Sequence, residues 1–535
     1  MIDERDVGAT SLESKVLESG VSLSQSVIWG LQRDYYARRG LKAWSEDNVP
    51  SYITSNPFIA EVYAGIVAAF IDDSTSPSVP GAAQLSPERP LRILELGAGT
   101  GKFAYLFLRK LTALLEVKKI PPQVIRYCMA DCSQDLLAAW KENPYLARFT
   151  AAGILEFDLL LAGEENSSQP EPCNLAGGTL VVIANYVFDS LPLDAFVINQ
   201  GKMEEALITT SAGPADGGNT PSPGSLQFSF NNVPVPQHRY TDKVWNGILE
   251  HYRSSVPAAT IFFPTAALDL LQHLAASSNG CMLVLAADKG FTREENLALR
   301  QGEPQLEFHA SGNCFSAIVN FDAIARYFWS TGGEAFLPQK HFSNLSLCAF
   351  LQHPPEQEFP ATRQAYCEAS QVFGPDDLFT LMTWLESHLN ELTIPQALSV
   401  LRLTRWDPTA LLQIFPVIAP QLRSVGAERI DLRDAVFSVM ANRFPISRSD
   451  NELAFYCGVI LLELRFFAEA MEMFTISEQT LGRSAATSYN LGLCAAGQGR
   501  SEEALAFMVK ACDQDPKFAP AQSARARLEG ERKQS

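Results

Sequence analysis

The stretch Arg89–Leu111, RPLRILELGAGTGKFAYLFLRKL, joins a short apolar run, a turn made mostly of glycine and a helix-patterned segment. An apolar run as short as Leu91 to Leu96, ended by glycine, is typical of a buried strand. Strand–turn–helix units of this kind hold nucleotides at the turn, where a glycine backbone can approach the ligand closely. The stretch therefore predicts an α/β fold with a nucleotide site at the turn.

Two phosphate-binding motifs do not fit this turn. A P-loop needs a glycine five residues before the Gly-Lys pair and Ser or Thr after the lysine, but Leu96 and Phe103 stand there. A dinucleotide fingerprint needs G-x-G-x-x-G, and Lys102 replaces its third glycine. What remains is E-L-G-x-G-x-G, with Glu95 two residues before Gly97. This motif resembles motif I of class I S-adenosylmethionine-dependent methyltransferases.

The chemistry of S-adenosylmethionine explains which residues are expected to bind it. The turn consists of Gly97, Ala98, Gly99, Thr100 and Gly101, and its glycines let the backbone press against the ligand without Cβ clashes.

Three acids are candidates for the polar parts of the same ligand. Glu95 can attract the ammonium group, directly or through water. Asp131 ends the next apolar run and is expected to accept hydrogen bonds from the ribose hydroxyls, with a helix N-cap as the alternative. Asp158, in ILEFDLL, is a candidate near the adenine, or else a surface acid.

The most specific later segment is Thr179–Ile198, TLVVIANYVFDSLPLDAFVI, an apolar strand that ends in polar Asn185 and Asp189. In open α/β sheets ligands bind at the carboxyl ends of strands, so we predict that both side chains face the methyl acceptor. Strand-end capping is the alternative.

The segment resembles the A-N-E-x-x-D-A-L-P motif of the MidA family of methyltransferases, which includes a mitochondrial complex I assembly factor. Residues 30–330 show further blocks of resemblance, such as GCMLVLAADKG and RQGEPQLEFHASGNCFSAIVNFDAI. The resemblance implies a methyltransferase associated with protein arginine methylation. Catalytic roles follow for Asn185 and Asp189, and for His309, which could relay the acceptor proton or be a loop histidine bonded to backbone. Tyr186 replaces the family's glutamate, and Asp189, Asp194 or Asp288 could substitute for it.

Composition limits the other possibilities. The formal charge of −18 opposes nucleic-acid binding, and the apolar runs are about half the roughly 20 residues that a membrane span needs. The ten cysteines form no Cys-x-x-Cys pair, so we expect reduced thiols, no metal site and a cytoplasmic protein.

The chain is too long for one core. We predict an N-terminal leader and helical segment over residues 1–90, a Rossmann-like methyltransferase domain with a mainly parallel sheet over 91–355, an all-α helical region over 366–450, and repeats over 451–535. The repeat has a 34-residue period that aligns Gly458, Ala470 and Phe474 with Gly492, Ala504 and Met508. This resembles tetratricopeptide repeats (TPRs), which suggests that the C-terminal region grips a protein or a second copy of the chain.

Three functional interpretations follow. The first is a methyltransferase that acts on a protein, on arginine or another side chain. The second is a small-molecule methyltransferase whose repeats mediate assembly. The third is an inactive adaptor with a methyltransferase fold.

Overall fold

The structure is a computed structural model that describes residues 15–45, 52–76, 84–160, 178–212, 223–278, 280–308, 314–340 and 344–534. The chain divides into two compact units. Unit 1 comprises Met1–Thr54 and Val62–Asp376, and unit 2 comprises Ser55–Glu61 and Asp377–Ser535. Unit 1 joins the predicted N-terminal segment with the predicted methyltransferase domain, and the finer boundaries remain predictions.

A seven-stranded sheet forms the centre of unit 1, in the order β15-β16-β10-β5-β2-β3-β4. The five strands from β10 to β4 are parallel, and β16 and β15 are antiparallel. This confirms the expected mainly parallel sheet and adds a mixed edge. The strands are β2 (Leu91–Leu96), β3 (Ile125–Asp131), β4 (Leu155–Leu159), β5 (Leu180–Asn185), β10 (Met282–Asp288), β15 (Glu334–Phe336) and β16 (Ser346–Gln352).

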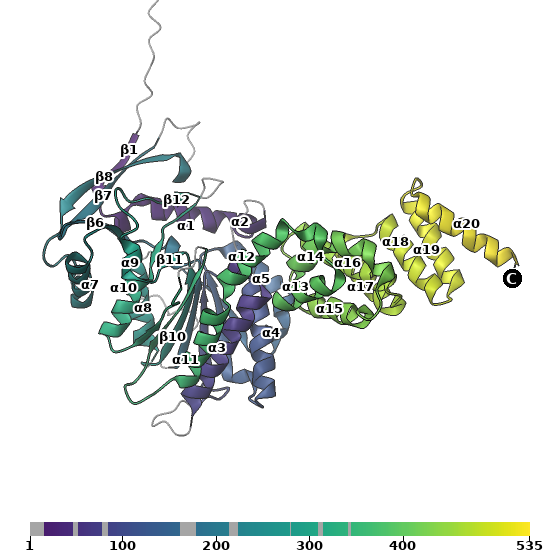
Figure 1. The fold of residues 1–535 in the computed structure, drawn as a ribbon, viewed down its shortest axis with the longest axis horizontal. Coiled ribbons are helices and arrows are strands. Elements are labelled where there is room, and N and C mark those ends of the chain that lie inside the picture. Colours follow the sequence, from purple (N-terminus) through teal and green to yellow (C-terminus); the bar gives the residue numbers. More distant parts are fainter. Residues whose placement is uncertain are drawn as a thin grey trace, which may run out of the picture. The chain divides into compact units, whose positions relative to one another are not determined.

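Helices cover both faces of this sheet because its central strands are apolar on both sides. In Figure 1, α3 and α4 lie on one side of the sheet and α8 and α10 on the other. The first face includes a chain of aromatic contacts from Tyr63 through Phe103 and Phe107 to Tyr127. The helices of unit 1 that matter here are α1 (Val27–Arg39), α2 (Lys42–Ser45), α3 (Pro57–Thr75, which begins in unit 2), α4 (Lys102–Val117), α5 (Gln134–Glu142), α7 (Lys243–Ser255), α8 (Thr265–Ser277), α9 (Glu294–Leu297) and α10 (Phe321–Ser330).

A second, antiparallel sheet in unit 1 has the order β1-β7-β6-β9, with β8 also paired to β7. Its first strand lies in the predicted N-terminal leader, so the end of that leader is a paired strand. It pairs with β7 in antiparallel fashion. The strands are β1 (Lys15–Val21), β6 (Asp194–Asn199), β7 (Lys202–Ala212), β8 (Leu226–Pro234) and β9 (Ala258–Phe263).

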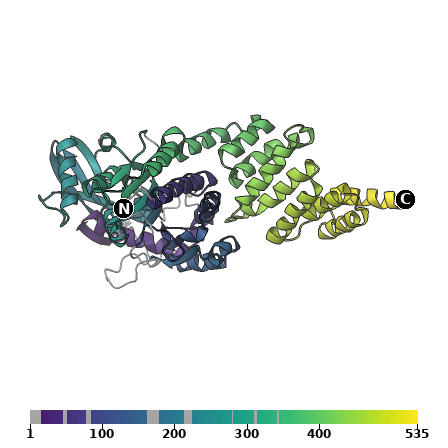
Figure 2. The same ribbon diagram turned by 90° about the horizontal axis from the view of Figure 1, so that it is seen from below.

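Unit 2 is helical throughout its described residues, as predicted for the region after residue 366. Figures 1 and 2 show packed helix pairs joined by short loops toward the C-terminus. The helices are α12 (Pro375–Glu386, which begins in unit 1), α13 (Ile394–Leu403), α14 (Pro408–Ile418), α15 (Arg429–Ala441), α16 (Arg448–Glu463), α17 (Phe467–Leu481), α18 (Ala485–Gly497), α19 (Ser501–Gln514) and α20 (Ala519–Gln534).

The predicted repeat is visible in the packing of two of these pairs. A Cβ on Gly458 in α16 would lie 2.7 Å from the ring of Phe474 in α17, and one on Gly492 in α18 would lie 2.7 Å from Cε of Met508 in α19. Equivalent glycines therefore let equivalent helices approach closely. The assignment of this pattern to tetratricopeptide repeats stays a prediction.

This packing gives a stability prediction. We expect Gly458→Ala to destabilise the protein by about 1–3 kcal/mol, because the new methyl group would force the Phe474 ring to move. Gly530→Ala is the matched control, since Gly530 is helical and has open space where its Cβ would lie. It should stabilise the protein by up to about 1 kcal/mol. Denaturant unfolding of the full chain measures both, and equal effects from the two variants would contradict the packing argument.

One helical stretch of the described residues, Tyr52–Thr75, is long and apolar enough to cross a membrane. However, 72% of the apolar 18-residue window within this stretch is buried inside the protein. A buried core helix passes the same test, so the stretch is weak evidence for a membrane span.

The cysteines differ in one respect from the expectation. Cys128 in β3 is disulfide-bonded, so the prediction that all ten thiols are reduced is wrong for this residue. The other cysteines in the described ranges are free.

Candidate functional site

The glycine turn between β2 and α4 adopts a conformation that its sequence makes possible. Gly97, Gly99 and Gly101 have φ angles of 64°, 53° and 80°, in the left-handed region that favours glycine. The amide of Gly99 donates to Asp131 Oδ2 at 3.0 Å, and its carbonyl accepts from Trp140 Nε1 at 2.9 Å. Both polar groups of Gly99 are therefore engaged within the chain, and what the residue can offer a ligand is its bare Cα.

Sheet register places Glu95 and Asp131 on the same face. Glu95 pairs with Met129, two residues before Asp131, and side chains two apart point the same way. Both carboxyls are almost fully buried, at 5% and 6% exposed. Glu95 accepts a hydrogen bond from the Tyr127 hydroxyl at 2.8 Å, a partner that the sequence did not indicate. The structure thus brings the two predicted donor acids together beside the turn.

The pKa values of both acids follow from burial. Burial raises the pKa of Glu95 to about 8, with the Tyr127 hydrogen bond opposing the shift and the charge of Asp131 adding to it. Burial also raises the pKa of Asp131, although the amides of Gly99 and Cys132 oppose that shift. Glu95 therefore carries a proton over part of the neutral range.

This shift predicts how stability depends on pH. The pKa of Glu95 is about 8 in the folded protein, against an ordinary value of 4.5. Between these values the folded protein binds more protons at this site than the unfolded chain, so the free energy of unfolding falls as the pH rises from about 4.5 to 8. We expect Glu95→Gln to remove this dependence. From pH 5 to pH 9, the free energy of unfolding of the variant should therefore rise by on the order of 4 kcal/mol relative to that of the wild-type protein. If the free energies of unfolding of the two proteins changed with pH by the same amount across that range, the expectation would be contradicted.

Asp158 lies on the face of the sheet opposite Glu95 and Asp131. It pairs with Ala130 in β3, and Ala130 belongs to the core on the opposite side of the sheet from Met129 and Glu95. Its Oδ1 accepts from the amide of Leu159 at 2.8 Å, and the residue is half-buried. Its role near the adenine stays a prediction.

A second group of polar residues gathers where β5 and β10 end. The Tyr63 hydroxyl donates to Asn185 Oδ1 at 2.6 Å, and the Phe188 amide donates to Asp288 Oδ2 at 3.1 Å. Asn185 Nδ2 and Asp288 Oδ1 are buried and find no hydrogen-bond partner among the described residues. Such atoms are costly unless something satisfies them, so they point to a ligand at this edge.

Asp189 completes this group. It lies in the short helical turn Phe188–Ser190 and accepts from Ser190 Oγ at 2.9 Å. Burial raises its pKa to about 6, and burial together with the charge of Asp189 raises the pKa of Asp288 well above its usual value. No ion pair gives either carboxyl a cationic partner within the part of the chain that the structure describes.

Two tyrosine hydroxyls lie within electrostatic reach of these acids. Tyr186, which replaces the family's glutamate, has φ of 53°, a strained conformation for a bulky residue. Burial and the charges of Asp288 and Asp189 raise its pKa. Tyr36 in α1 also lies within electrostatic reach of Asp189.

The remaining predicted residues lie elsewhere. His309 falls outside the described residues. Asp194 accepts from the Tyr240 hydroxyl at 2.7 Å and lies 3.5 Å from Arg239, so it belongs to the second sheet. Sequence reasoning missed Tyr36, Tyr63 and Trp140, because no motif marks them.

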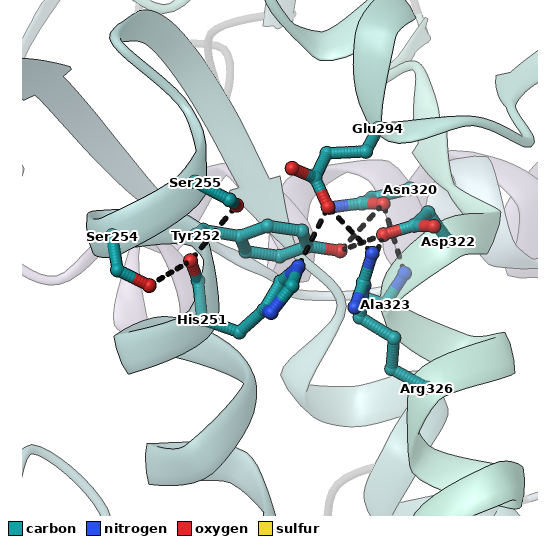
Figure 3. Close-up of polar contacts among 9 residues, drawn as sticks. All are labelled: His251, Tyr252, Ser254, Ser255, Glu294, Asn320, Asp322, Ala323 and Arg326. Carbon is teal, nitrogen blue, oxygen red and sulfur yellow. Dashed lines mark hydrogen bonds and ion pairs between the residues drawn. The ribbon is translucent and has the colours of Figure 1, made fainter.

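A separate polar network joins α7, α9 and α10 (Figure 3). Arg326 donates to Asp322 and Glu294, each at 2.6 Å, and the Tyr252 hydroxyl donates to Asp322 at 2.7 Å. A cavity of about 620 Å³ adjoins the network and is partly lined by Trp329, but it shares no lining residue with the glycine turn. Because the network's charges pair with one another, we assign it to fixing α10 against α7.

Comparison with known proteins agrees with this geometry. Residues 80–325, just under half of the chain, match the model of a family described as "Putative S-adenosyl-L-methionine-dependent methyltransferase". The predicted cofactor, S-adenosylmethionine, is confirmed. The matched span contains the glycine turn, Glu95, Asp131, Asn185, Asp189 and Asp288, the residues on which the predicted methyltransferase site rests. No curated protein matches the chain.

Similar solved structures include two proteins of one superfamily from Burkholderia thailandensis. One is uncharacterized, with 16% identity, a TM-score of 0.39, and coverage of 64% of this chain and 91% of its own. The other is a "likely methyl transferase" bound to S-adenosyl-homocysteine, with 18% identity, a TM-score of 0.38, and coverage of 62% and 88%. MamA from Desulfovibrio magneticus RS-1 matches 29% of this chain and 86% of its own, at 17% identity and a TM-score of 0.24.

The residues at the turn fit the cofactor. A backbone without side chains at Gly97, Gly99 and Gly101 can approach a nucleoside closely. Asp131, at the end of β3, can accept hydrogen bonds from hydroxyl groups in addition to those from Gly99 and Cys132. When bound, S-adenosylmethionine would supply an activated methyl group, and the protein's part would be to position the acceptor and exclude water.

Proposed function

We propose that the protein transfers a methyl group from S-adenosylmethionine to a cationic nitrogen of a protein, with the arginine guanidinium as the foremost candidate. The observation that carries this proposal is the pair of buried acids, Asp189 and Asp288, beside Asn185 at the carboxyl edge of the sheet. Two buried carboxyls without a cationic partner among the described residues are costly. A cationic acceptor would supply that partner.

The surroundings of the acids suit a flat cation. A guanidinium offers several donors in a fixed plane, and Asp288 Oδ1 is a buried acceptor without a described partner. Tyr36 and Tyr186 lie within electrostatic reach of the two acids, and aromatic faces attract cations. In this proposal Asp189 and Asp288 together take over the role of the motif glutamate that Tyr186 replaces in this sequence.

The acids also have a role in moving a proton. Methylation of a guanidinium nitrogen replaces one N–H with N–C while the product stays charged, so one proton must leave. Asp189 and Asp288 have raised pKa values, which makes an ionised carboxylate of this pair a better proton acceptor than an ordinary one. Asp189, with a pKa of about 6, is largely ionised at neutral pH and can take that proton.

The helical unit supports the choice of a protein as acceptor. Helix α16 packs on α17 and α18 packs on α19, and stacked helix pairs of this kind can form extended surfaces for peptide binding. The acidic chain, with a net charge of −18, favours a basic partner and faster encounter with it. In this proposal the helix pairs bind the acceptor protein or a second copy of the chain, and the protein works in the cytoplasm.

The test uses a labelled methyl donor and matched peptides. We expect the full-length protein to transfer the labelled methyl group to arginine-containing peptides from a basic library, and not to the same peptides with citrulline, a neutral isostere of arginine. Labelling of citrulline peptides at the same rate would contradict a cationic acceptor. Labelling that appears only in the small-molecule fraction of a lysate would instead support the small-molecule interpretation.

One observation favours a second candidate, the inactive adaptor. The indole of Trp44 in α2 lies against Gly99, on the surface that the donor would contact. If the indole fills that place permanently, the fold would serve only as a scaffold. Titration of the wild-type protein with S-adenosylhomocysteine separates the two candidates, because an adaptor of this kind would not bind it.

A further inference from the structure

Two helices from the start of the chain lie across the carboxyl edge of the seven-stranded sheet (Figure 1). We call α1 and α2, Val27–Ser45, the N-terminal cap. Ser133 Oγ donates to the carbonyl of Ala37 at 3.3 Å, and the amide of Phe315 donates to Gln32 Oε1 at 2.9 Å. These contacts fix the cap to the segment after β3 on one side and to the short strand β13 (Phe315–Ser316) on the other.

The cap places one aromatic side chain directly on the glycine turn. A Cβ on Gly99 would lie 3.1 Å from Cζ2 of Trp44, 3.3 Å from Cε2 and 3.6 Å from Cη2. The six-membered ring of the indole therefore lies against the side of Gly99 that a side chain would occupy, and a Cβ there would be in tight contact with it. Trp44 is half-buried, and its ring centroid lies 6.1 Å from that of Tyr36.

We propose that Trp44 is a further donor-binding residue, whose indole packs on the S-adenosylmethionine held by the glycine turn. The proposal rests on the proposed function. Gly99 has its amide engaged by Asp131 and its carbonyl by Trp140, so a ligand meets this residue through its Cα. The indole lies against that same Cα, so a ligand seated there is next to the indole.

The chemistry of the two partners favours their contact. An adenine is a flat aromatic ring that can stack on an indole. A sulfonium is a cation, and tryptophan is the aromatic side chain that attracts cations most strongly. The half-buried indole keeps part of its surface free for a ligand.

The cap also reaches the acceptor side of the site. Tyr36, on the same cap, lies within electrostatic reach of Asp189. One segment thus covers both the donor and the acceptor sides and would exclude water from between them.

Binding of S-adenosylhomocysteine, measured by calorimetry, tests the proposal without relying on turnover. We expect Trp44→Ala to weaken binding by about tenfold or more, which is about 1.4 kcal/mol, and Trp44→Phe to keep affinity within about threefold of wild type because it keeps an aromatic face. Trp329→Ala is the control, since Trp329 is half exposed in α10 and lines the separate cavity. It should bind as wild type does. Thermal unfolding of each variant checks that it is folded.

Intrinsic fluorescence gives a second measurement. Ligand contact should change the emission of the wild-type protein, and this change should be reduced in Trp44→Phe and kept in Trp329→Ala. If the wild-type protein fails to bind S-adenosylhomocysteine, both the proposed function and this inference are overturned. If the wild type binds and folded Trp44→Ala binds as well or more tightly, only this inference is overturned, and tighter binding would mean that the indole fills the donor's place.

Discussion

Replacing Gly99 with valine is expected to abolish donor binding, with a loss of affinity of at least about 100-fold. The new Cβ would lie 3.1 Å from the Trp44 indole, and the branched side chain would stand where a ligand must approach the backbone. A φ of 53° adds strain that valine tolerates poorly. Calorimetry with S-adenosylhomocysteine measures the loss.

Gly201→Val is the matched control for that substitution. Gly201 has φ of 77° in the turn between β6 and β7, so the backbone strain is of the same kind. Nothing lies within 4 Å of the position its Cβ would take. We expect this variant to lose some stability and to bind the donor with wild-type affinity. If both variants bind normally, the glycine turn is not the donor site.

The second large effect is expected from the acceptor acids. Asp288→Asn and Asp189→Asn should each lower turnover by about 10²–10⁴-fold, because each removes a carboxyl group that would hold a cationic acceptor or take its proton. Donor affinity should remain within about threefold of wild type, since neither residue lies in the glycine turn. In Asp288→Asn the amide oxygen of the new side chain can still accept from the Phe188 amide, so the fold should survive.

A buried acid outside this group provides the comparison. Asp194 is 1% exposed and interacts with Tyr240 and Arg239 in the second sheet. Asp194→Asn should lower the melting temperature and leave turnover per folded molecule unchanged. If the Asp189 and Asp288 variants keep wild-type turnover, a cationic acceptor held by these acids is refuted.

The same acids predict the pH dependence of turnover. The pKa of Asp189 is raised to about 6 by burial, so protonation below pH 6 removes the charge that attracts the acceptor. We expect kcat/KM to rise as the pH increases through about 6 in the wild-type protein. The rise should be absent from the residual activity of Asp189→Asn, and an unchanged profile in that variant would assign the titration to another group.

Several elements follow from short-range sequence rules. The run Leu91–Leu96 is apolar and ends at glycine, and it forms β2 with the bounds that the pattern suggests. Gly97, Gly99 and Gly101 all take positive φ angles, as a residue without a Cβ permits. Likewise, a 34-residue repeat of small and large residues fixes which helices pack closely, since the Gly458–Phe474 contact depends on residues 16 apart in the chain.

Other features depend on residues that no local pattern connects. Asp131 and Asp158 both lie near strand ends, yet the register of β3 with β4 places Asp158 beside Ala130, on the face opposite Glu95. A register shift of one residue would reverse that result, and the register is set by the pairing of whole strands. The hydrogen bond from Tyr127 to Glu95 depends in the same way on the register of β2 with β3.

The sequence by itself determined the glycine turn, the strands around it, the acids at the strand ends and the period of the helical repeat, because each is encoded within one segment by backbone freedom or by apolar spacing. Only the tertiary structure decided that Trp44 lies on Gly99, that Tyr63 reaches Asn185, and that Asp189 and Asp288 share a buried site. Those contacts join residues separated by about fifty to over a hundred positions. They form because burying apolar surface brings whole elements together, and no single segment specifies which of its side chains will meet.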